Sequence, residues 1–200
     1  MIISIPPRNP MCLDNHAYWE DFLSNDEINF ILAQPEWLSV SSAVVGGQHS
    51  PPIQNSEIRR SEVAWLSGKP ELQDIWTKLS DVVAEVNRRF FHYDLTGFHE
   101  PMQLGVYQSN NNGYYNWHCD AAPEDTKVPR KLSMCLLLSD PAEFEGGELQ
   151  IMSSNDIPVS LEQRRGRAWF FPSWMLHRVT PVTRGIRRSA VLWVGGPAFR

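Results

Sequence analysis

The spacing of apolar residues separates the chain into a helical first half and a strand-rich second half. Across residues 70–91 apolar side chains recur at helical spacing, which predicts a long amphipathic helix packed against the outer face of a sheet. Ser24-Asn25-Asp26-Glu27 has the pattern of a capping box and predicts a shorter helix that ends near Ala33. Residues 38–45 and 56–66 are strand-like, and the Gly- and Pro-rich stretch between them is expected to be a loop.

Eight short stretches after residue 97 have the apolar content and flanking turn residues of strands. They are residues 102–107, 114–119, 132–138, 148–152, 157–161, 167–171, 176–180 and 187–194. So many short strands in succession predict a β-sandwich or jelly roll. With the helices before them, they place the chain in the mainly β class with flanking helices, an α+β fold.

Composition indicates one compact domain and argues against two kinds of partner. The 200 residues, 42% of them hydrophobic, suffice for one sizeable core, so we expect a single domain over residues 1–200. Helices and supporting strands are expected in residues 1–100 and the β core in residues 101–200. The net charge of -5 disfavours nucleic-acid binding. The lack of a signal-like start and of an apolar run near ~18 residues predicts a cytoplasmic protein with no membrane span.

His118 and Asp120 are the first candidates for chemistry, because alternate residues of a strand face the same side. His177 follows a second apolar run, at residues 168–172, and can bring another imidazole to the same space. Two histidines and one carboxylate form the facial triad that binds non-haem Fe(II) and leaves coordination positions open. Cys119 is expected on the opposite strand face, packed rather than ligating, and three cysteines do not indicate a disulfide framework.

Arg187, ten residues after His177, supplies a fixed cationic fork for a carboxylate ligand. Strand alternation places it on the same face as Ser189, and a guanidinium with a nearby hydroxyl can hold one carboxylate of a dicarboxylic acid. Tyr107 and Tyr115 are candidates for hydrogen bonds to that acid or for the wall of its pocket.

Several short motifs follow one another in order along the second half of the chain. They are Tyr107, Tyr115-x-x-His118-x-Asp120, residues 132–138, Glu145-Gly146-Gly147-Glu148-Leu149, residues 166–172, residues 177–182, Gly185-x-Arg187 and Trp193. This ordered set resembles the 2-oxoglutarate/Fe(II)-dependent oxygenases, and within them the prolyl-4-hydroxylase-like branch that includes bacterial and phage enzymes. The resemblance implies a double-stranded β-helix, or jelly roll, backed by the N-terminal helices.

The resemblance also implies a chemistry. The implied Fe(II) ligands are His118, Asp120 and His177, and the implied 2-oxoglutarate contacts are Arg187, Ser189, Tyr107 and Tyr115. With O2, and with ascorbate as a further candidate cofactor, such enzymes decarboxylate 2-oxoglutarate to succinate and CO2 and hydroxylate a substrate. Asp120 favours hydroxylation, because related halogenases have a small residue there. Gly146-Gly147 is interpreted as a turn, and Glu148 is not assigned to the metal.

The expected substrate is a prolyl or another residue in a peptide or protein. Two alternatives stay open: hydroxylation of a free amino acid or small metabolite, and a non-catalytic jelly-roll binding module. A nucleic-acid demethylase of this superfamily would carry a second arginine where this chain has Trp193. Loops at residues 46–55 and 121–131 are hypothesised to cover the substrate, the first of them as a lid. The sequence leaves the oligomeric state open.

Overall fold

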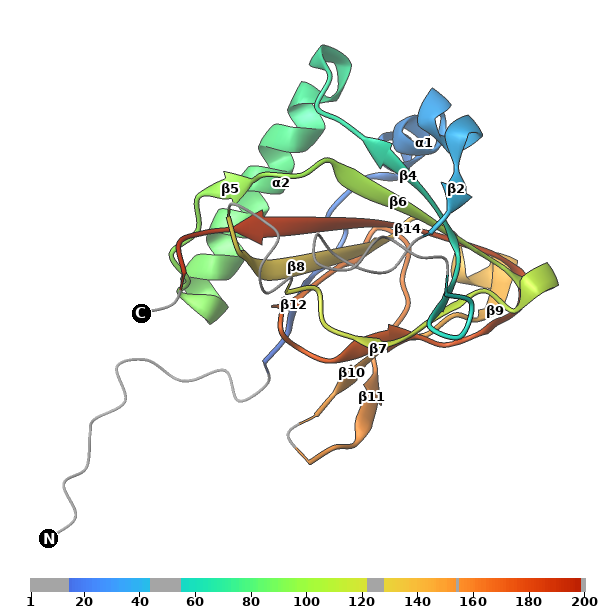
Figure 1. Ribbon diagram of the computed structural model, residues 1–200. Coiled ribbons are helices and arrows are strands. Elements are labelled where there is room, and N and C mark those ends of the chain that lie inside the picture. Colours follow the sequence, from blue (N-terminus) through green and yellow to red (C-terminus); the bar gives the residue numbers. More distant parts are fainter. Residues whose placement is uncertain (1–14, 44–54, 122–127, 154, 199–200) are drawn as a thin grey trace, which may run out of the picture.

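A computed structural model describes residues 15–43, 55–121, 128–153 and 155–198, which form two antiparallel sheets with two α-helices over the larger one (Figure 1). The larger sheet runs in the order β1 (Ala17–Trp19), β12 (Ala168–Pro172), β8 (Arg130–Leu137), β14 (Val182–Gly195), β6 (Met102–Gln108), β4 (Glu62–Leu66) and β2 (Ser41–Ser42). The smaller sheet runs in the order β11 (Pro158–Ser160), β10 (Leu149–Met152), β13 (His177–Val179), β7 (Tyr114–His118) and β3 (Arg59–Arg60). Two further strands, β5 (Gly97–Phe98) and β9 (Phe144–Gly146), pair with β14.

Both predicted helices are present. In α1 (Asn25–Leu32) the Ser24 hydroxyl accepts from the Glu27 backbone N–H, and the Glu27 carboxylate accepts from that of Ser24, which confirms the predicted capping box. The long helix α2 spans Gln73–Val86, with a 3₁₀ turn at Pro70–Leu72 before it and a π-helical turn at Asn87–Phe91 after it. The predicted span of residues 70–91 is therefore helical throughout, with α-helical geometry only in its middle.

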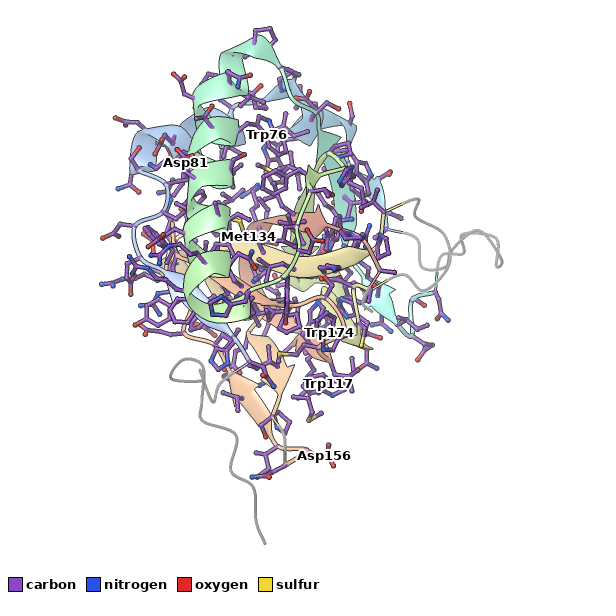
Figure 2. The ribbon with its side chains drawn as sticks, turned by 90° about the vertical axis from the view of Figure 1, so that its left-hand side faces the viewer. Trp76, Asp81, Trp117, Met134, Asp156 and Trp174 are labelled. Carbon is purple, nitrogen blue, oxygen red and sulfur yellow. The ribbon has the colours of Figure 1, made fainter. Side chains whose placement is uncertain are left out.

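Two apolar layers hold the molecule together, one on each face of the larger sheet. The layer between helices and sheet includes Ile31, Leu79, Val86, Leu104, Leu136, Ala190 and Leu192. Figure 2 shows Met134, another member, lying under α2. The layer between the two sheets includes Tyr107, Cys135, Leu137, Phe144, Leu149, Phe171 and Val179. Alternate residues of one strand thus serve different layers, as strand geometry requires.

Alternation is clearest along β14, the longest strand. Ala190, Leu192 and Val194 lie in the layer under the helices. Arg187 and Ser189, which are also buried, alternate with them and so face the smaller sheet. Strand alternation therefore predicted correctly which face of β14 carries Arg187.

The strand predicted at residues 38–45 is wrong in its first part. Pro35–Ser39 form a 3₁₀ helix that Pro35 begins, and only Ser41–Ser42 are extended as β2. Leu38 is 89% exposed, so the apolar residue that suggested a strand is not buried against anything. Residues 44 and 45 lie outside the described part of the chain.

The strand predicted at residues 56–66 is split at Ser61. Arg59–Arg60 join the smaller sheet as β3, and Glu62–Leu66 join the larger sheet as β4, so the chain crosses from one sheet to the other at this point. The strands β1, β5 and β9 were not predicted, since two or three residues are too few to show a period. Among the described residues there is no helix with the length and apolarity needed to cross a membrane.

Candidate metal centre

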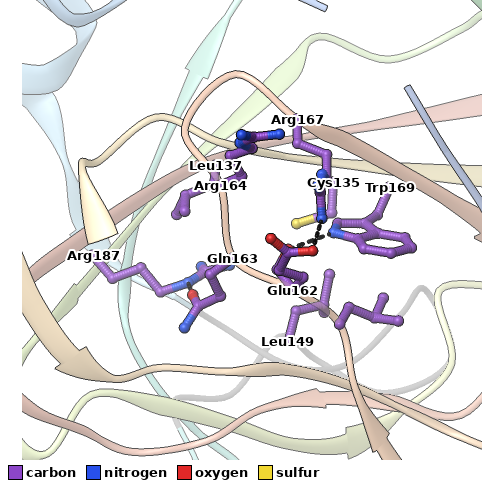
Figure 3. A pocket seen from close by; sticks show the side chains of 10 residues that line it. Cys135, Leu137, Leu149, Glu162, Gln163, Arg164, Arg167, Trp169 and Arg187 are labelled. Carbon is purple, nitrogen blue, oxygen red and sulfur yellow. Dashed lines mark hydrogen bonds and ion pairs between the residues drawn. The ribbon is translucent and has the colours of Figure 1, made fainter. Parts of the chain in front are cut away.

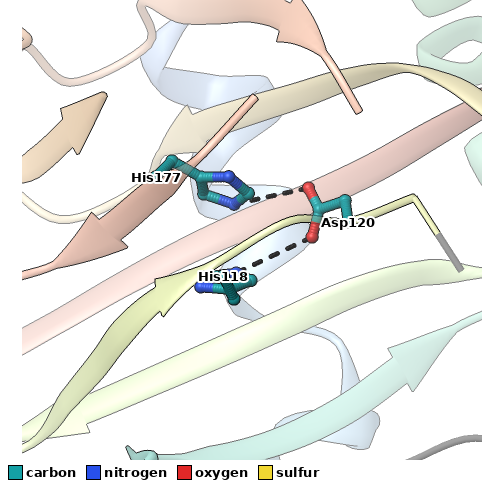
Figure 4. Close-up of side chains that lie close together, drawn as sticks. All are labelled: His118, Asp120 and His177. Carbon is teal, nitrogen blue, oxygen red and sulfur yellow. Dashed lines mark ion pairs between the residues drawn. The ribbon is translucent and has the colours of Figure 1, made fainter. Parts of the chain in front are cut away.

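The three predicted ligands come together between the sheets. His118 ends β7, Asp120 follows two residues later, and His177 begins β13 opposite His118 in the antiparallel register. One ligand atom from each residue lies within 4.8 Å of the others (Figure 4). The side chains of His118, Asp120 and His177 are 14%, 8% and 7% exposed, so the cluster is largely shielded from water.

Backbone carbonyls fix the direction of both imidazoles. Nδ1 of His118 lies 2.7 Å from the carbonyl oxygen of Asn116, and Nδ1 of His177 lies 2.9 Å from that of Met175. A carbonyl oxygen only accepts, so each Nδ1 carries the proton and donates it. Each Nε2 is left facing the Asp120 carboxylate, at 3.8 Å for His118 and 3.4 Å for His177. This is the tautomer in which a histidine can offer Nε2 to a metal.

The Asp120 carboxylate is held by one buried hydroxyl, that of Ser133, which in turn contacts the hydroxyl of Ser173. Ser133 Oγ donates to Asp120 Oδ2 over 2.8 Å and lies 3.0 Å from Ser173 Oγ. Burial raises the pKa of the Asp120 carboxyl, but the two histidines and the Ser133 hydroxyl lower it, and the resulting pKa lies below the ordinary value. Burial, with the neighbouring His177, lowers the pKa of His118 to about 3. At neutral pH the site therefore offers an ionised carboxylate and a neutral His118 imidazole.

This donor set fits a divalent transition metal. Two imidazole nitrogens and one carboxylate on the same side leave further coordination positions open, which is the arrangement of non-haem Fe(II) sites. The carbonyl and hydroxyl partners of the three ligands are of the kind that hold ligands in orientation around such a metal. The residues present are thus suited to Fe(II).

An aromatic stack backs His118. The Tyr115 ring lies nearly parallel to the His118 imidazole, with ring centres 3.4 Å apart, and the Arg59 guanidinium lies 4.4 Å from the Tyr115 ring centre. Arg59 itself donates to Ser61 Oγ and to Gln103 Oε1. Burial raises the pKa of Tyr115 to about 12. Tyr115, predicted to contact a cosubstrate or line its pocket, therefore packs directly against a metal ligand.

Arg187 is buried between the same two sheets, and no described carboxylate pairs with it. It is 2% exposed. Its Nη1 donates to Ser189 Oγ over 3.1 Å, and its Cζ lies 5.4 Å from the centre of the Tyr107 ring. Arg187 lies six residues from Trp193 along β14. Trp193 pairs with Ser133, the residue that contacts Asp120, so Arg187 and the triad occupy different parts of the space between the sheets. A buried cation with neutral neighbours is costly, and an anion bound beside it would offset that cost.

A recess opens beside Arg187 (Figure 3). Its apolar wall is formed by Leu137, Leu149, Leu161 and Trp169, and its polar wall by Cys135, Glu162, Gln163, Arg164 and Arg167. The Arg187 guanidinium is thus the only cation of this wall that has no acidic partner among the described residues, because Arg164 and Arg167 both pair with Glu20.

The Gly146-Gly147 pair forms the predicted turn and also makes room for Arg187. Both residues have positive φ, +73° and +61°, which favours glycine. A Cβ at Gly147 would lie 2.8 Å from Cδ of Arg187 and 2.9 Å from Cγ2 of Val182. Any other residue at position 147 would therefore displace the arginine side chain.

The expectation that Cys119 is packed is wrong. It is exposed, and its thiol donates to the carbonyl oxygen of Trp174 over 3.0 Å. The reason is that β7 ends at His118, so strand alternation no longer applies at the next residue. Glu148 accepts from Gln150 and Ser160, and it is not part of the ligand cluster.

The two loops expected over the substrate are only partly described. Residues 122–127 and 46–54 lie outside the described part of the chain, as does His49. Arg130 and Lys131, expected in the second loop, already belong to β8. Among the described residues, His16, His92 and His99 are not in the ligand cluster.

Four residues of this region were not anticipated from the sequence. They are Arg59, Ser133, Gln163 and Ser173. Each reaches the site through contacts with residues distant in the chain, and only Ser133 lies within one of the ordered motifs. Of the four, Ser133 alone could be placed from the sequence, because strand alternation in β8 puts it on the face of the larger sheet that is turned toward the smaller one.

Comparison with known proteins finds similarity over the second half of the chain. Residues 102–195 match the family model described as the 2OG-Fe(II) oxygenase superfamily. A PKHD-type hydroxylase of Teredinibacter turnerae is 38% identical over 98 residues, which are 47% of this chain and 42% of that protein. A PKHD-type hydroxylase of Paraburkholderia xenovorans is 28% identical over 163 residues, which are 78% of this chain and 68% of that protein. The match to the first relative thus spans less than half of its length.

The fold extends over more of the chain than these motifs do. A crystal structure of a prolyl-4-hydroxylase from Pseudomonas putida matches with a TM-score of 0.70 at 19% identity, covering 92% of this chain and 94% of that one. The likeness confirms the predicted mainly β fold with flanking helices. The expectation of Fe(II) with 2-oxoglutarate is confirmed at the level of the matched family and the ligand triad, and ascorbate stays a prediction.

Proposed function

Residues 102–195 match the 2OG-Fe(II) oxygenase superfamily, and from that premise we propose that the chain is an Fe(II)- and 2-oxoglutarate-dependent hydroxylase. One observation carries the proposal: the space between the sheets holds two complementary sites. His118, Asp120 and His177 offer a ligand set for a divalent cation. Arg187, buried without an acidic partner among the described residues, offers a separate place for an anion.

Each side chain then has a definite task. The triad would hold Fe(II), and Arg187 with Ser189 would hold the distal carboxylate of 2-oxoglutarate, beside the Tyr107 ring. When bound, Fe(II) and 2-oxoglutarate supply the oxidising chemistry with O2 that yields hydroxylated substrate, succinate and CO2. The Tyr115 ring, stacked on one ligand, shields that side of the site from water.

We propose further that the substrate is a residue of a peptide or protein, with proline as the first candidate. Trp193, 5% exposed, lies near enough to Asp120 to help lower the pKa of that carboxyl, yet no described acceptor has hydrogen-bonding geometry to its indole nitrogen. Trp65, 44% exposed, lies 6.2 Å from Trp193, and flat aromatic faces suit a pyrrolidine ring.

Arg130 supports the same proposal for the substrate. Its guanidinium lies 3.7 Å from the Trp193 ring centre, donates to the Asp120 carbonyl oxygen and pairs with Glu100. It therefore lines the approach to Asp120 with polar groups, which a peptide backbone can bind through its own amides. The P. putida protein of the same fold is a prolyl-4-hydroxylase by name, which agrees with this choice.

The test is succinate release from 2-oxoglutarate with Fe(II) and O2, with and without proline-containing peptides. We expect a peptide to stimulate succinate release. Hydroxylation of that peptide should be seen as a mass gain of ~16 Da, the mass of one oxygen atom. Stimulation by free amino acids alone would favour the small-molecule alternative. Absence of Fe(II)-dependent succinate with every substrate, and of 2-oxoglutarate binding, would favour a non-catalytic module.

A further inference from the structure

Gln163 occupies the wall of the recess next to Arg187, in the loop before β12 (Figure 3). We propose that Gln163 determines the specificity of the cosubstrate site by holding Arg187 with a neutral amide. In this role it fixes the guanidinium without neutralising its charge, which stays available to the distal carboxylate of 2-oxoglutarate. The inference rests on the proposed function and assigns a role to a residue outside the recognised motifs.

The amide of Gln163 is oriented by contacts at both of its ends. Its Oε1 accepts from Nε of Arg187 at 3.5 Å, a long hydrogen bond, and its Nε2 donates to the carbonyl oxygen of Gly146 at 3.2 Å. Because the Gly146 carbonyl can only accept, the amide nitrogen must face it and the amide oxygen must face the arginine. The backbone of the glycine turn thereby directs an acceptor at Arg187.

The charges of the recess show why a neutral residue matters at this position. Glu162 is the only carboxylate that the described residues contribute to the recess wall, and Arg167 pairs with it at 2.8 Å. Figure 3 shows Gln163 lying between Arg187 and Glu162. The carboxylate is thus occupied by a different cation, and the group next to Arg187 carries no charge.

A carboxylate at position 163 would change this balance while keeping the shape. Glutamate and glutamine are nearly isosteric, so Gln163→Glu places a negative charge beside Nε of Arg187 with little other change. A buried or half-buried pair of this kind would have to be broken or shared before a second carboxylate could bind, and the two carboxylates would repel. The affinity for 2-oxoglutarate should therefore fall, whereas ligands confined to the metal should bind as before.

The experiment compares two ligands of the Mn(II)-loaded full-length protein by calorimetry. One is 2-oxoglutarate. The other is oxalate, a two-carbon acid that retains a metal-chelating 1,2-dicarbonyl group and lacks the distal carboxylate. In Gln163→Glu we expect the dissociation constant for 2-oxoglutarate to rise roughly tenfold to a hundredfold, the range of a charge-assisted hydrogen bond, and that for oxalate to stay within about twofold. Glu145→Gln is the control, because that exposed carboxylate pairs with Arg184 outside the recess, and it should leave both constants unchanged.

The outcomes separate this inference from the proposed function. Unchanged 2-oxoglutarate affinity in Gln163→Glu, or equal losses for both ligands, would overturn the role of Gln163. An Arg187→Met protein that binds 2-oxoglutarate as tightly as the parent would instead overturn the cosubstrate site itself. If Gln163→Glu does not fold, Gln163→Leu replaces it: a loss confined to 2-oxoglutarate supports positioning of Arg187, and no loss or a loss of both ligands contradicts it.

Discussion

The two ends of the space between the sheets have opposite electrostatic characters. The metal end, made of His118, Asp120 and His177, collects a carboxylate and imidazole nitrogens around one point. The arginine end, made of Arg187, Ser189 and Gln163, collects neutral hydrogen-bonding groups around one cation. The first suits a cation and the second an anion, so one ligand can be held at both ends only if it chelates a metal and carries a distal negative charge.

The two ends also differ in how the chain builds them. At the metal end each histidine is oriented by a carbonyl two residues earlier in its own segment. At the arginine end the orientation of Arg187 depends on Gly147 and Gln163, which come from other parts of the chain. We therefore expect changes at the metal end to act locally and changes at the arginine end to act through packing. Four substitutions test that difference.

The largest effect is expected at the metal end. Asp120→Ala removes the only carboxylate of the triad and should abolish turnover and lower Mn(II) affinity by more than the roughly 10- to 100-fold that loss of an outer contact costs. Titration with Mn(II), followed by electron paramagnetic resonance, measures this. Glu148→Ala is the matched control, because within the described part of the chain that carboxylate bonds to Gln150 and Ser160 and not to a metal ligand. If Asp120→Ala bound Mn(II) as tightly as the parent protein, the assignment of Asp120 as a metal ligand would be wrong.

The next effect is expected at the arginine end. Arg187→Ala loses a charge-assisted contact of about 1.5–3 kcal/mol, so the dissociation constant for 2-oxoglutarate should rise roughly tenfold to a hundredfold or more. Arg188→Ala should change it much less, because Arg188 is on the opposite face of β14. The charge-transfer band of the anaerobic Fe(II) and 2-oxoglutarate complex reports both constants. The reverse order of the two variants would show that the wrong arginine was chosen.

A smaller effect on 2-oxoglutarate binding is expected from a substitution that changes packing but no charge. Gly147→Ala keeps every charge, but the new Cβ, 2.8 Å from Cδ of Arg187, should displace that side chain and weaken 2-oxoglutarate binding by roughly tenfold, below the loss of the arginine itself. Positive φ should also cost about 1–3 kcal/mol of folding stability. Gly97→Ala is the control, since Gly97 has φ +134° and nothing within 4 Å of the added carbon. It should lower the melting temperature and leave 2-oxoglutarate affinity unchanged.

The smallest effect is expected for an outer contact of the metal end. Ser133→Ala removes the hydroxyl that donates to Asp120 Oδ2, and Mn(II) affinity should fall about threefold to tenfold, at or below the low end for such contacts. The affinity for 2-oxoglutarate at saturating Mn(II) should not change, because Arg187 is untouched. A larger loss for 2-oxoglutarate than for Mn(II) would mean that the two ends are coupled.

The sequence was informative where the structure depends on neighbours in the chain. The capping box at Ser24, the long helix and the face of β14 that carries Arg187 were all predicted from local spacing. The grouping of His118, Asp120 and His177 came from strand alternation together with a family resemblance, and the structure brings these residues together.

The rest depends on contacts that spacing does not encode. Gln163 approaches Arg187 only because the loop before β12 folds over the glycine turn, and Arg59 reaches Tyr115 only because the chain changes sheets at Ser61. Neither residue has a neighbour in sequence that signals its partner. Short strands such as β1 are likewise defined by the strand beside them rather than by their own pattern.

Strand β1 has a consequence for solubility. Its three residues pair with Ala168, Trp169 and Phe170 and so cover the outer edge of β12. Without that cover, β12 would present free backbone N–H and C=O groups along an apolar strand, the arrangement that recruits strands of other molecules. The Glu20 carboxylate, paired with Arg167 and Arg164, fastens the same segment. Residues 17–20 thus act as a guard against edge-to-edge aggregation, and a protein shortened past them should precipitate before it loses its metal ligands.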